Sequence, residues 1–202
     1  MTLILALSLF VRLYDTTGLP QADLQHATMT ASAILSAAGI AVEWRDCHEG
    51  CDAPVAPSEL AVRVVASADG SRPSSLGYTF VTGGDDLGAL ATVVASRVRA
   101  MAREAGCDAG TLIGRAIAHE VGHALLGTSG HASAGLMRAT WKASELYNNH
   151  PGDWTFSRDE AARMRGRLAA RLDSARSAPS SAPWCVPCTP PCRDGVVCDA
   201  LP

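Results

Sequence analysis

The sequence predicts an α/β (α+β) fold, and three observations lead to this prediction. Apolar residues make up 48% of the 202 residues and the formal net charge is only -3, so the chain can bury a core of its own. Short runs rich in valine, leucine and isoleucine alternate with longer segments whose apolar residues recur at helical spacing. Turn-forming glycines, prolines and serines separate these segments. We expect one domain over residues 1–176, a flexible linker over 177–184 and a cysteine- and proline-rich tail over 185–202.

The first part of the chain is expected to form four strands and one helix. The helix is predicted over 22–39, because its apolar residues have helical spacing and Gly39 is a natural helix stop. Apolar runs bounded by turn residues predict strands over about 3–14, 40–46, 59–66 and 77–81. Glycines and serines isolate the last of these, GYTFV, which is typical of an edge strand.

Helices dominate the second part. A fifth strand over 89–96 is expected to continue into a helix over 97–106. The next helix spans 109–126 and is stopped by Gly127, and its apolar residues recur every four positions on a face expected to pack on the sheet: Ile113, Ile117, Val121 and Leu125. One helical turn is expected within 142–149.

A terminal helix is predicted over 156–176. Ser157 and Glu160 stand three residues apart at its start, in the capping-box arrangement.

The opening run MTLILALSLF allows two interpretations. It is too short to span a bilayer, so we expect no stable membrane span. It also lacks a positively charged start and a small-residue cleavage pattern. A buried strand and a remnant of a signal peptide therefore both remain open, and a start site upstream of Met1 would reconcile them.

Seven cysteines are many for a chain of this size and favour an oxidising compartment, which predicts a secreted or cell-envelope protein. Cys47 and Cys51 are near enough in sequence to close a small disulfide ring. Four tail cysteines fit two disulfides better than a four-thiolate zinc site: Cys185, Cys188, Cys192 and Cys198. Cys107 is then left over, either buried or free.

The charge pattern bears on partners. Arginines are scattered through the predicted helices and do not gather with aromatic residues, so we expect no nucleic-acid partner. We expect the protein to be a monomer.

The segment AHEVGHALLGTSGH, residues 118–131, contains an HExxH pattern. His119 and His123 stand four apart on a predicted helix, so both rings can reach a single ion. Glu120 borders the position of a metal-activated water. Zinc lowers the pKa of such a water and polarises a substrate carbonyl, and Glu120 would accept the proton as general base.

A hydrolytic zinc site needs three protein ligands and one open position. His131 follows the turn GTSG, whose glycines permit a sharp reversal of the chain toward the ion. Glu145 lies on a possible later helix, which is another common way to complete such a site. His150 and Asp153 are weaker candidates.

These residues resemble the zincin metalloproteases and, more narrowly, the metzincins. The metzincin signature is HExxHxxGxxH followed by a methionine-containing turn. The text HEVGHALLGTSGHASAGLM departs from it as an extended HExxHxxxGxxxH motif, with one more residue before the glycine and one more before the last histidine. The resemblance implies a mixed, mostly parallel five-stranded sheet with an antiparallel edge strand. This sheet would be packed on the active-site helix and two further helices, in a catalytic domain over 1–176.

The resemblance also implies roles for single residues. His119, His123 and His131 would hold one catalytic Zn²⁺, and Met137 would form the Met-turn beneath it. Glu145 would be the third ligand in the related gluzincin arrangement, but its neighbours do not match that family's pattern, so we favour His131. An extended peptide would bind along the edge strand, at Tyr78, Thr79, Phe80 and Val81.

The sequence therefore predicts a zinc metalloendopeptidase, a hydrolase of protein or peptide substrates. A non-catalytic, zinc-stabilised binding module on the same fold is one alternative. A hydrolase of a non-peptide amide or ester is another. Glu120 favours an enzyme, because a site that only holds metal needs no carboxylate at this position.

Overall fold

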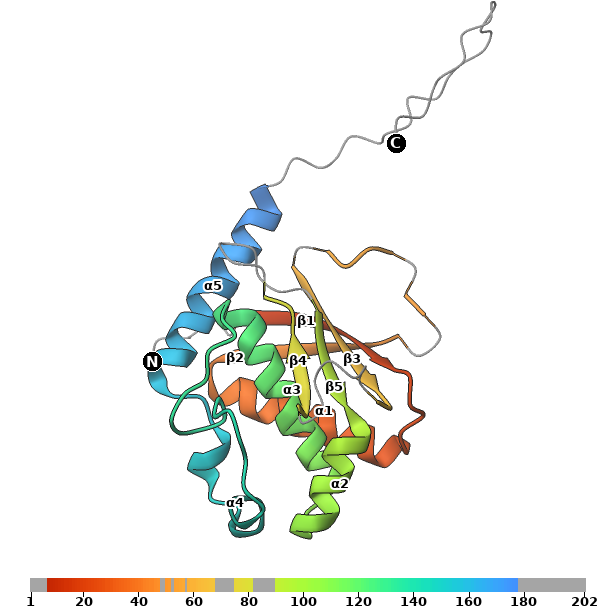
Figure 1. Ribbon diagram of the computed structural model, residues 1–202. Helices are drawn as coiled ribbons and strands as arrows, with labels where there is room; N and C mark the ends of the chain where they lie inside the picture. Colours follow the sequence, from red (N-terminus) through yellow and green to blue (C-terminus); the bar gives the residue numbers. More distant parts are fainter. Residues whose placement is uncertain are drawn as a thin grey trace, which may run out of the picture.

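The computed structural model describes residues 7–47, 50–51, 53–56, 58–67, 75–81 and 90–177. Five strands form one sheet in the order β2-β1-β3-β5-β4 (Figure 1). Their bounds are Leu7–Asp15 for β1, Ile40–Asp46 for β2, Glu59–Val65 for β3, Gly77–Thr79 for β4 and Leu90–Val94 for β5. The first four strands of that order are parallel, and β4 runs antiparallel to β5 at the edge. The predicted fold class is confirmed.

Five α-helices accompany the sheet within the described residues. They are α1 (Gln21–Ala37), α2 (Ala95–Ala105), α3 (Ala109–Leu126), α4 (Ala143–Asn148) and α5 (Arg158–Ser177), with a 3-10 turn, η1, at Pro151–Trp154. The resemblance implies only two helices besides the active-site helix. The residue pattern also predicted helical structure over 97–106 and 142–149, and α2 and α4 lie close to these two segments. Helix α5 begins with the predicted capping box, because Ser157 N–H donates to Glu160 Oε2 at 2.7 Å and Glu160 N–H to Ser157 Oγ at 3.3 Å. None of the described helices is long and apolar enough to cross a membrane.

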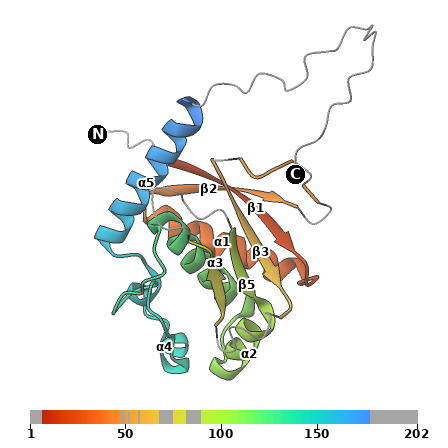
Figure 2. The ribbon, with the colours of Figure 1, turned by 45° about the horizontal axis from the view of Figure 1, so that its top comes forward.

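Helices α1 and α3 run side by side and together cover one face of the sheet (Figure 1, Figure 2). Two glycines of α3 allow this close approach. A Cβ at Gly114 would lie 2.5 Å from the Ala27 carbonyl oxygen, and a Cβ at Gly110 would lie 2.7 Å from that of Asp23. Any larger residue at these positions would push the two helices apart.

Helix α3 is buried on almost every side. Ile113, Ile117, Val121 and Leu125 are fully buried, as predicted, but so is nearly every other residue of the helix. Burial extends beyond the face that packs on the sheet, because α1, α2 and α5 also pack around α3. Four polar side chains of this helix are therefore buried: Arg115, His119, Glu120 and His123.

Four strands differ from their predicted bounds. Strand β3 ends at Val65, one residue early, and β5 ends at Val94 because α2 begins at Ala95. Strand β1 is described from Leu7, and residues 1–6 lie outside the described residues. Strand β4 ends at Thr79, earlier than the predicted end at Val81. The described pairing of β4 with β5 ends at Thr79, which is opposite Ala91, one residue after the start of β5 at Leu90.

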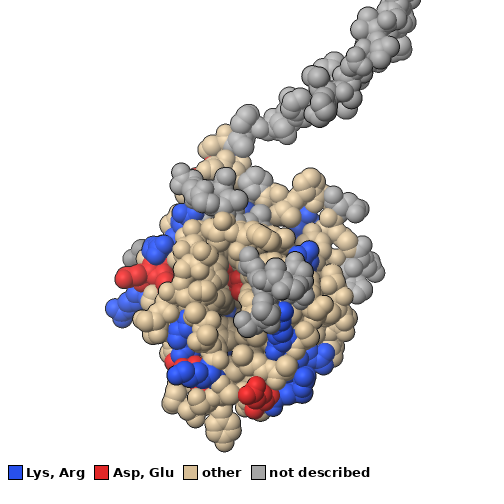
Figure 3. All heavy atoms as spheres, in the orientation of Figure 1, with Lys and Arg blue, Asp and Glu red and all other residues tan. Residues whose placement is uncertain are grey.

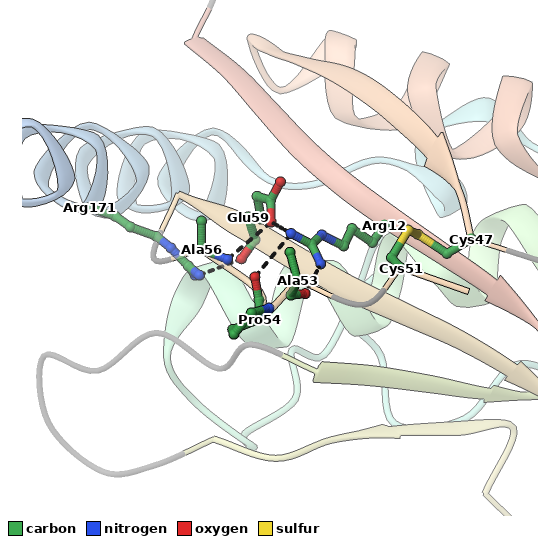
Figure 4. A network of polar contacts seen from close by, with 8 residues as sticks. All are labelled: Arg12, Cys47, Cys51, Ala53, Pro54, Ala56, Glu59 and Arg171. Carbon is green, nitrogen blue, oxygen red and sulfur yellow. Dashed lines mark hydrogen bonds and ion pairs between the residues drawn. A yellow bond between two sulfur atoms is a disulfide. The ribbon is translucent and has the colours of Figure 1, made fainter. Parts of the chain in front are cut away.

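A polar network connects β1, the start of β3 and the terminal helix (Figure 4). Buried Arg12 of β1 pairs with Glu59 Oε2 at 2.5 Å and donates to the Ala53 and Pro54 carbonyls. Arg171 of α5 donates to the Glu59 carbonyl at 2.6 Å. The Ala56 N–H and the Arg12 guanidinium hold the pKa of Glu59 below its ordinary value. The loop after β2 is thus held by the side chains of Arg12 and Glu59, and Arg171 connects the start of β3 to α5.

The described cysteines behave as predicted. Cys47 and Cys51 form a disulfide at the start of this loop (Figure 4). Cys107 is a half-buried free thiol, and burial raises its pKa. The four tail cysteines and the predicted linker, apart from Ser177, lie outside the described residues, so their state stays a prediction.

On the face drawn in Figure 3, charged side chains of both signs surround a largely uncharged surface.

Candidate metal centre

Three histidines meet beside the outer strand of the sheet. His119 and His123 stand one turn apart on α3, and Gly127 ends the helix in the left-handed conformation at φ 62°. The chain then turns back and brings the His131 ring to centroid distances of 5.4 Å from His119 and 4.8 Å from His123. Candidate ligand atoms from all three side chains lie within 4.8 Å of one another. The described residues therefore contain a group that could hold a metal ion.

Backbone carbonyls orient the two helical histidines. His119 Nδ1 lies 2.9 Å from the Leu136 carbonyl oxygen, and His123 Nδ1 lies 2.8 Å from that of Thr128. Because a carbonyl oxygen only accepts, each Nδ1 carries the ring proton and each Nε2 presents a lone pair. The two Nε2 atoms are 3.0 Å apart. Two lone pairs at this distance repel each other, and a cation that accepts both removes the repulsion, so this donor set fits zinc.

Burial keeps both rings neutral. Desolvation lowers the pKa of His119 to about 4, and the nearby histidines act in the same direction against the Leu136 hydrogen bond. Burial likewise lowers the pKa of His123. Neutral imidazole is the form that binds a metal, so the pair is ready for a cation at neutral pH without first losing protons.

The segment after His131 forms a turn that supports α3. Ala132 N–H donates to the Met137 carbonyl at 2.8 Å, and Leu136 N–H donates to that of Thr155 at 2.9 Å. Met137 is buried, and its Sδ would lie 2.7 Å from a Cβ at Gly122. The space left by Gly122 is thus occupied by the methionine and by the Phe156 ring. Met137 therefore packs on α3 at Gly122, which lies between His119 and His123 in sequence. The resemblance expects the methionine of the Met-turn close to this position.

Glu120 opens on the same cavity as the histidines. This cavity has a volume of about 440 Å³, and β4, Trp141 and the three histidines form parts of its wall. Glu120 Oε2 lies 2.8 Å from Thr79 Oγ1, and a Cβ at Gly77 would lie 2.8 Å from Glu120 Oε1. The carboxylate is therefore packed against the edge strand.

Only two of the four predicted substrate-binding residues belong to the edge strand. Tyr78 and Thr79 belong to β4, whereas Phe80 and Val81 follow it outside the strand. Phe80 is 58% exposed and contacts the Tyr78 ring edge-on at 5.6 Å. The Thr79 hydroxyl faces α3 and contacts Glu120, a role that the sequence did not indicate.

Glu145 lies away from the histidine group. Its Oε1 pairs with Arg138 at 2.8 Å, and its Oε2 accepts the Lys142 N–H at 2.8 Å. The Lys142 N–H, followed by the Arg138 charge, lowers the pKa of Glu145. Asp153 lies 3.8 Å from the same arginine. Of the two main candidates for a third ligand, the structure brings His131 and not Glu145 to the histidine pair.

Trp141 and Trp154 follow the motif in sequence, where a tryptophan can shape a pocket or simply pack, and they form an aromatic pair next to His119. Trp141 contacts His119 edge-on at 5.6 Å, donates to the Leu136 carbonyl at 3.3 Å and meets Trp154 at 5.4 Å. The Arg115 guanidinium covers the Trp154 ring at 4.0 Å. No spacing in the sequence indicates this cluster, because its members come from α3, the segment before α4 and η1.

No protein-family model matches the chain, and no curated protein matches its sequence. Solved structures do. A zinc-dependent peptidase from Methanocorpusculum labreanum is similar with a TM-score of 0.53 at 15% identity, over 76% of this chain and 99% of that chain. An archaemetzincin from Methanopyrus kandleri is similar with a TM-score of 0.50 at 14% identity, over 81% and 96%. At these identities the similarity concerns the fold alone: the chain shares the fold of these two proteins.

Proposed function

We propose that this chain is a zinc-dependent peptidase whose three histidines, His119, His123 and His131, hold one zinc ion. The observation that carries the proposal is the 3.0 Å approach of the His119 and His123 Nε2 atoms, each presenting a lone pair to the same point. The position of the His131 ring supports its role as third ligand. Three histidines leave a fourth coordination position for water or substrate.

Bound zinc supplies a Lewis acid that polarises the substrate carbonyl and lowers the pKa of a water. The chain's own residues do the rest. The Leu136 and Thr128 carbonyls hold the rings of His119 and His123 in their metal-binding tautomer. Glu120, as general base, accepts the proton of the attacking water at its carboxylate and later passes it to the leaving amine. Met137 packs beneath the helix and fixes its distance from the turn.

The substrate in this proposal is an extended peptide that an endopeptidase would cleave internally and that pairs with the edge strand along Tyr78, Thr79, Phe80 and Val81. The position of β4 at the sheet edge, next to Glu120 on the cavity wall, supports this arrangement. The exposed Phe80 ring offers apolar contact beyond the end of the strand.

A peptide-library digestion tests the activity. Wild type should cleave peptides, and chelator-treated protein and Glu120→Ala should not, although Glu120→Ala should retain its zinc by mass spectrometry. Cleavage that survives in Glu120→Ala would contradict the mechanism. A wild type that holds zinc and cleaves nothing would favour a binding module, and hydrolysis of esters or other amides without peptide cleavage would favour the non-peptide alternative.

We also propose that the protein works in an oxidising compartment, as a secreted or cell-envelope enzyme. The Cys47–Cys51 disulfide supports this proposal. Intact mass with and without reductant, measured on protein from its native source, would test it. A mass showing that all seven cysteines are reduced would contradict it.

A further inference from the structure

The Thr79 hydroxyl makes two contacts with one residue of α3. Its Oγ1 lies 2.8 Å from Glu120 Oε2 and 2.9 Å from the Glu120 backbone oxygen. Pairing of Thr79 with Ala91 sets the register of β4 and therefore the position of this hydroxyl along the strand. The hydroxyl therefore links the edge strand to both the side chain and the backbone of the proposed general base.

Gly77 completes the same contact from the other side. Residues two apart on a strand face the same side, so Gly77 and Thr79 both face α3. A Cβ at Gly77 would lie 2.8 Å from Glu120 Oε1 and 2.9 Å from its Cγ. The strand thus leaves room for one part of the carboxyl group and offers a hydrogen bond to the other.

A hydroxyl is chemically suited to this position. It can donate to an ionised carboxylate and can also accept from a protonated carboxyl group. When Glu120 takes the proton of the attacking water, the Thr79 hydrogen can turn to the Glu120 backbone oxygen, and threonine neither gains nor loses a proton. The contact with the side chain therefore persists through the transfer.

We infer that Thr79 is a positioning residue, which holds the Glu120 carboxyl group in place at the candidate metal centre. This inference rests on the proposed function, because it gives Glu120 the role of base. Thr79 touches neither the zinc nor the scissile bond in this scheme. It acts on turnover through the orientation of Glu120.

Two substitutions separate the hydroxyl from the rest of the side chain. Thr79→Val keeps the shape and removes the hydrogen bond, and Thr79→Ser keeps the hydroxyl. Thr92→Val on the adjacent β5 is the matched control, because Thr92 is fully buried and its hydroxyl has no hydrogen-bond partner in the described part of the chain. By strand alternation its side chain faces away from α3.

Steady-state kinetics on the zinc-loaded protein should separate an effect on kcat from an effect on KM. We expect Thr79→Val to lower kcat about tenfold with KM changed less than about twofold, as for loss of a hydrogen bond to a charged group. Thr79→Ser should recover kcat to within about threefold of wild type, and Thr92→Val should match wild type. Zinc content should be the same in all four proteins.

The zinc-free protein gives a readout that does not depend on activity. Thr79→Val should shift the unfolding midpoint downward by about 3 °C more in the wild-type background than in the Glu120→Ala background. The difference between the two shifts measures the coupling of Thr79 to the carboxyl group. Equal shifts in the two backgrounds would overturn the inference.

The kinetic outcomes also separate the two proposals. If the wild type is active and Thr79→Val has an equal or higher kcat, the role of Thr79 is overturned and the proposed peptidase function stands. A zinc-loaded wild type that cleaves no peptide would overturn the proposed function, and with it the positioning role in catalysis. Loss of zinc from Thr79→Val would also overturn the inference, since a positioning residue for Glu120 does not hold the ion.

Discussion

The helical histidines and His131 enter the candidate metal centre under different constraints. His119 and His123 are buried on α3, and backbone carbonyls hold both rings. His131 is exposed on a loop, and its described contacts are those of its ring with the other two. One half of the site is thus rigid before any ion binds, whereas the ion itself would hold the other half. This difference predicts unequal consequences when either half is changed.

The largest effect is expected from the rigid half. His123→Ala removes a ligand that the fold has already oriented and leaves a buried void beside His119. Zinc affinity should fall by about 1000-fold or more, as measured by competition with a chromophoric chelator. His150→Ala is the matched control, because His150 is an exposed histidine outside the group. Zinc binding by His123→Ala at wild-type affinity would contradict the proposed site.

A smaller loss is expected from the exposed half. His131→Ala should weaken zinc binding by about 100-fold, since the two helical ligands remain in place. Glu145→Ala should keep full affinity, because its carboxylate is engaged by Arg138 and the Lys142 N–H. Loss of zinc from Glu145→Ala together with full zinc in His131→Ala would reverse the assignment of the third ligand.

Acid should destabilise the zinc-free protein through the buried half. The native pKa of His119 is about 4, below the ordinary value of 6.5, so between these values the unfolded chain binds a proton that the native ring does not. Stability should therefore fall as the pH drops from 6.5 to 4, by up to about 3 kcal/mol from this group.

Denaturant unfolding at several pH values measures this effect. His119→Asn is the control, because its amide can still donate to the Leu136 carbonyl but does not titrate. An identical pH dependence in this variant would show that other groups cause the loss of stability.

The smallest effect concerns the support beneath the rigid half. Gly122→Ala places a Cβ 2.7 Å from Met137 Sδ and from Phe156 Cε1, and it should destabilise the fold by about 1–3 kcal/mol. Gly166→Ala, in α5 with nothing within 4 Å, should instead stabilise by about 1 kcal/mol. Thermal unfolding of both variants compares them. If Gly122→Ala unfolds at the same temperature as the wild type, the side chains of Met137 and Phe156 can move to accept the added methyl group.

The helical part of the site could be predicted from the sequence because it depends on local geometry. The spacing of His119 and His123 specifies one helix face, and a helix stop at Gly127 follows from its conformational freedom. The return of His131 is less local. It depends on the turn closed by Ala132 and Met137 and on the bond from Leu136 to Thr155, which joins segments that no short pattern relates.

The role of Thr79 could not be predicted. The sequence placed Thr79 on the edge strand, but the face that its side chain occupies depends on the register of β4 with β5. A slip of one residue would turn Thr79 away from α3 and bring Tyr78 toward it. The elements that bury α3 could not be predicted either, because the pattern of apolar residues along one helix does not show that α1, α2 and α5 pack around it.

The last helix has a consequence for the order in which the site can form during synthesis. Phe156, just before α5, packs on α3 at Gly122, and the Arg167 guanidinium of α5 fills the space that a side chain at Gly127 would need. Both residues leave the ribosome after the whole HExxH segment. A nascent chain that ends before Phe156 therefore carries all three histidines but lacks both of these contacts with α3. On the proposed function, we expect hydrolytic activity to begin only after α5 has been made.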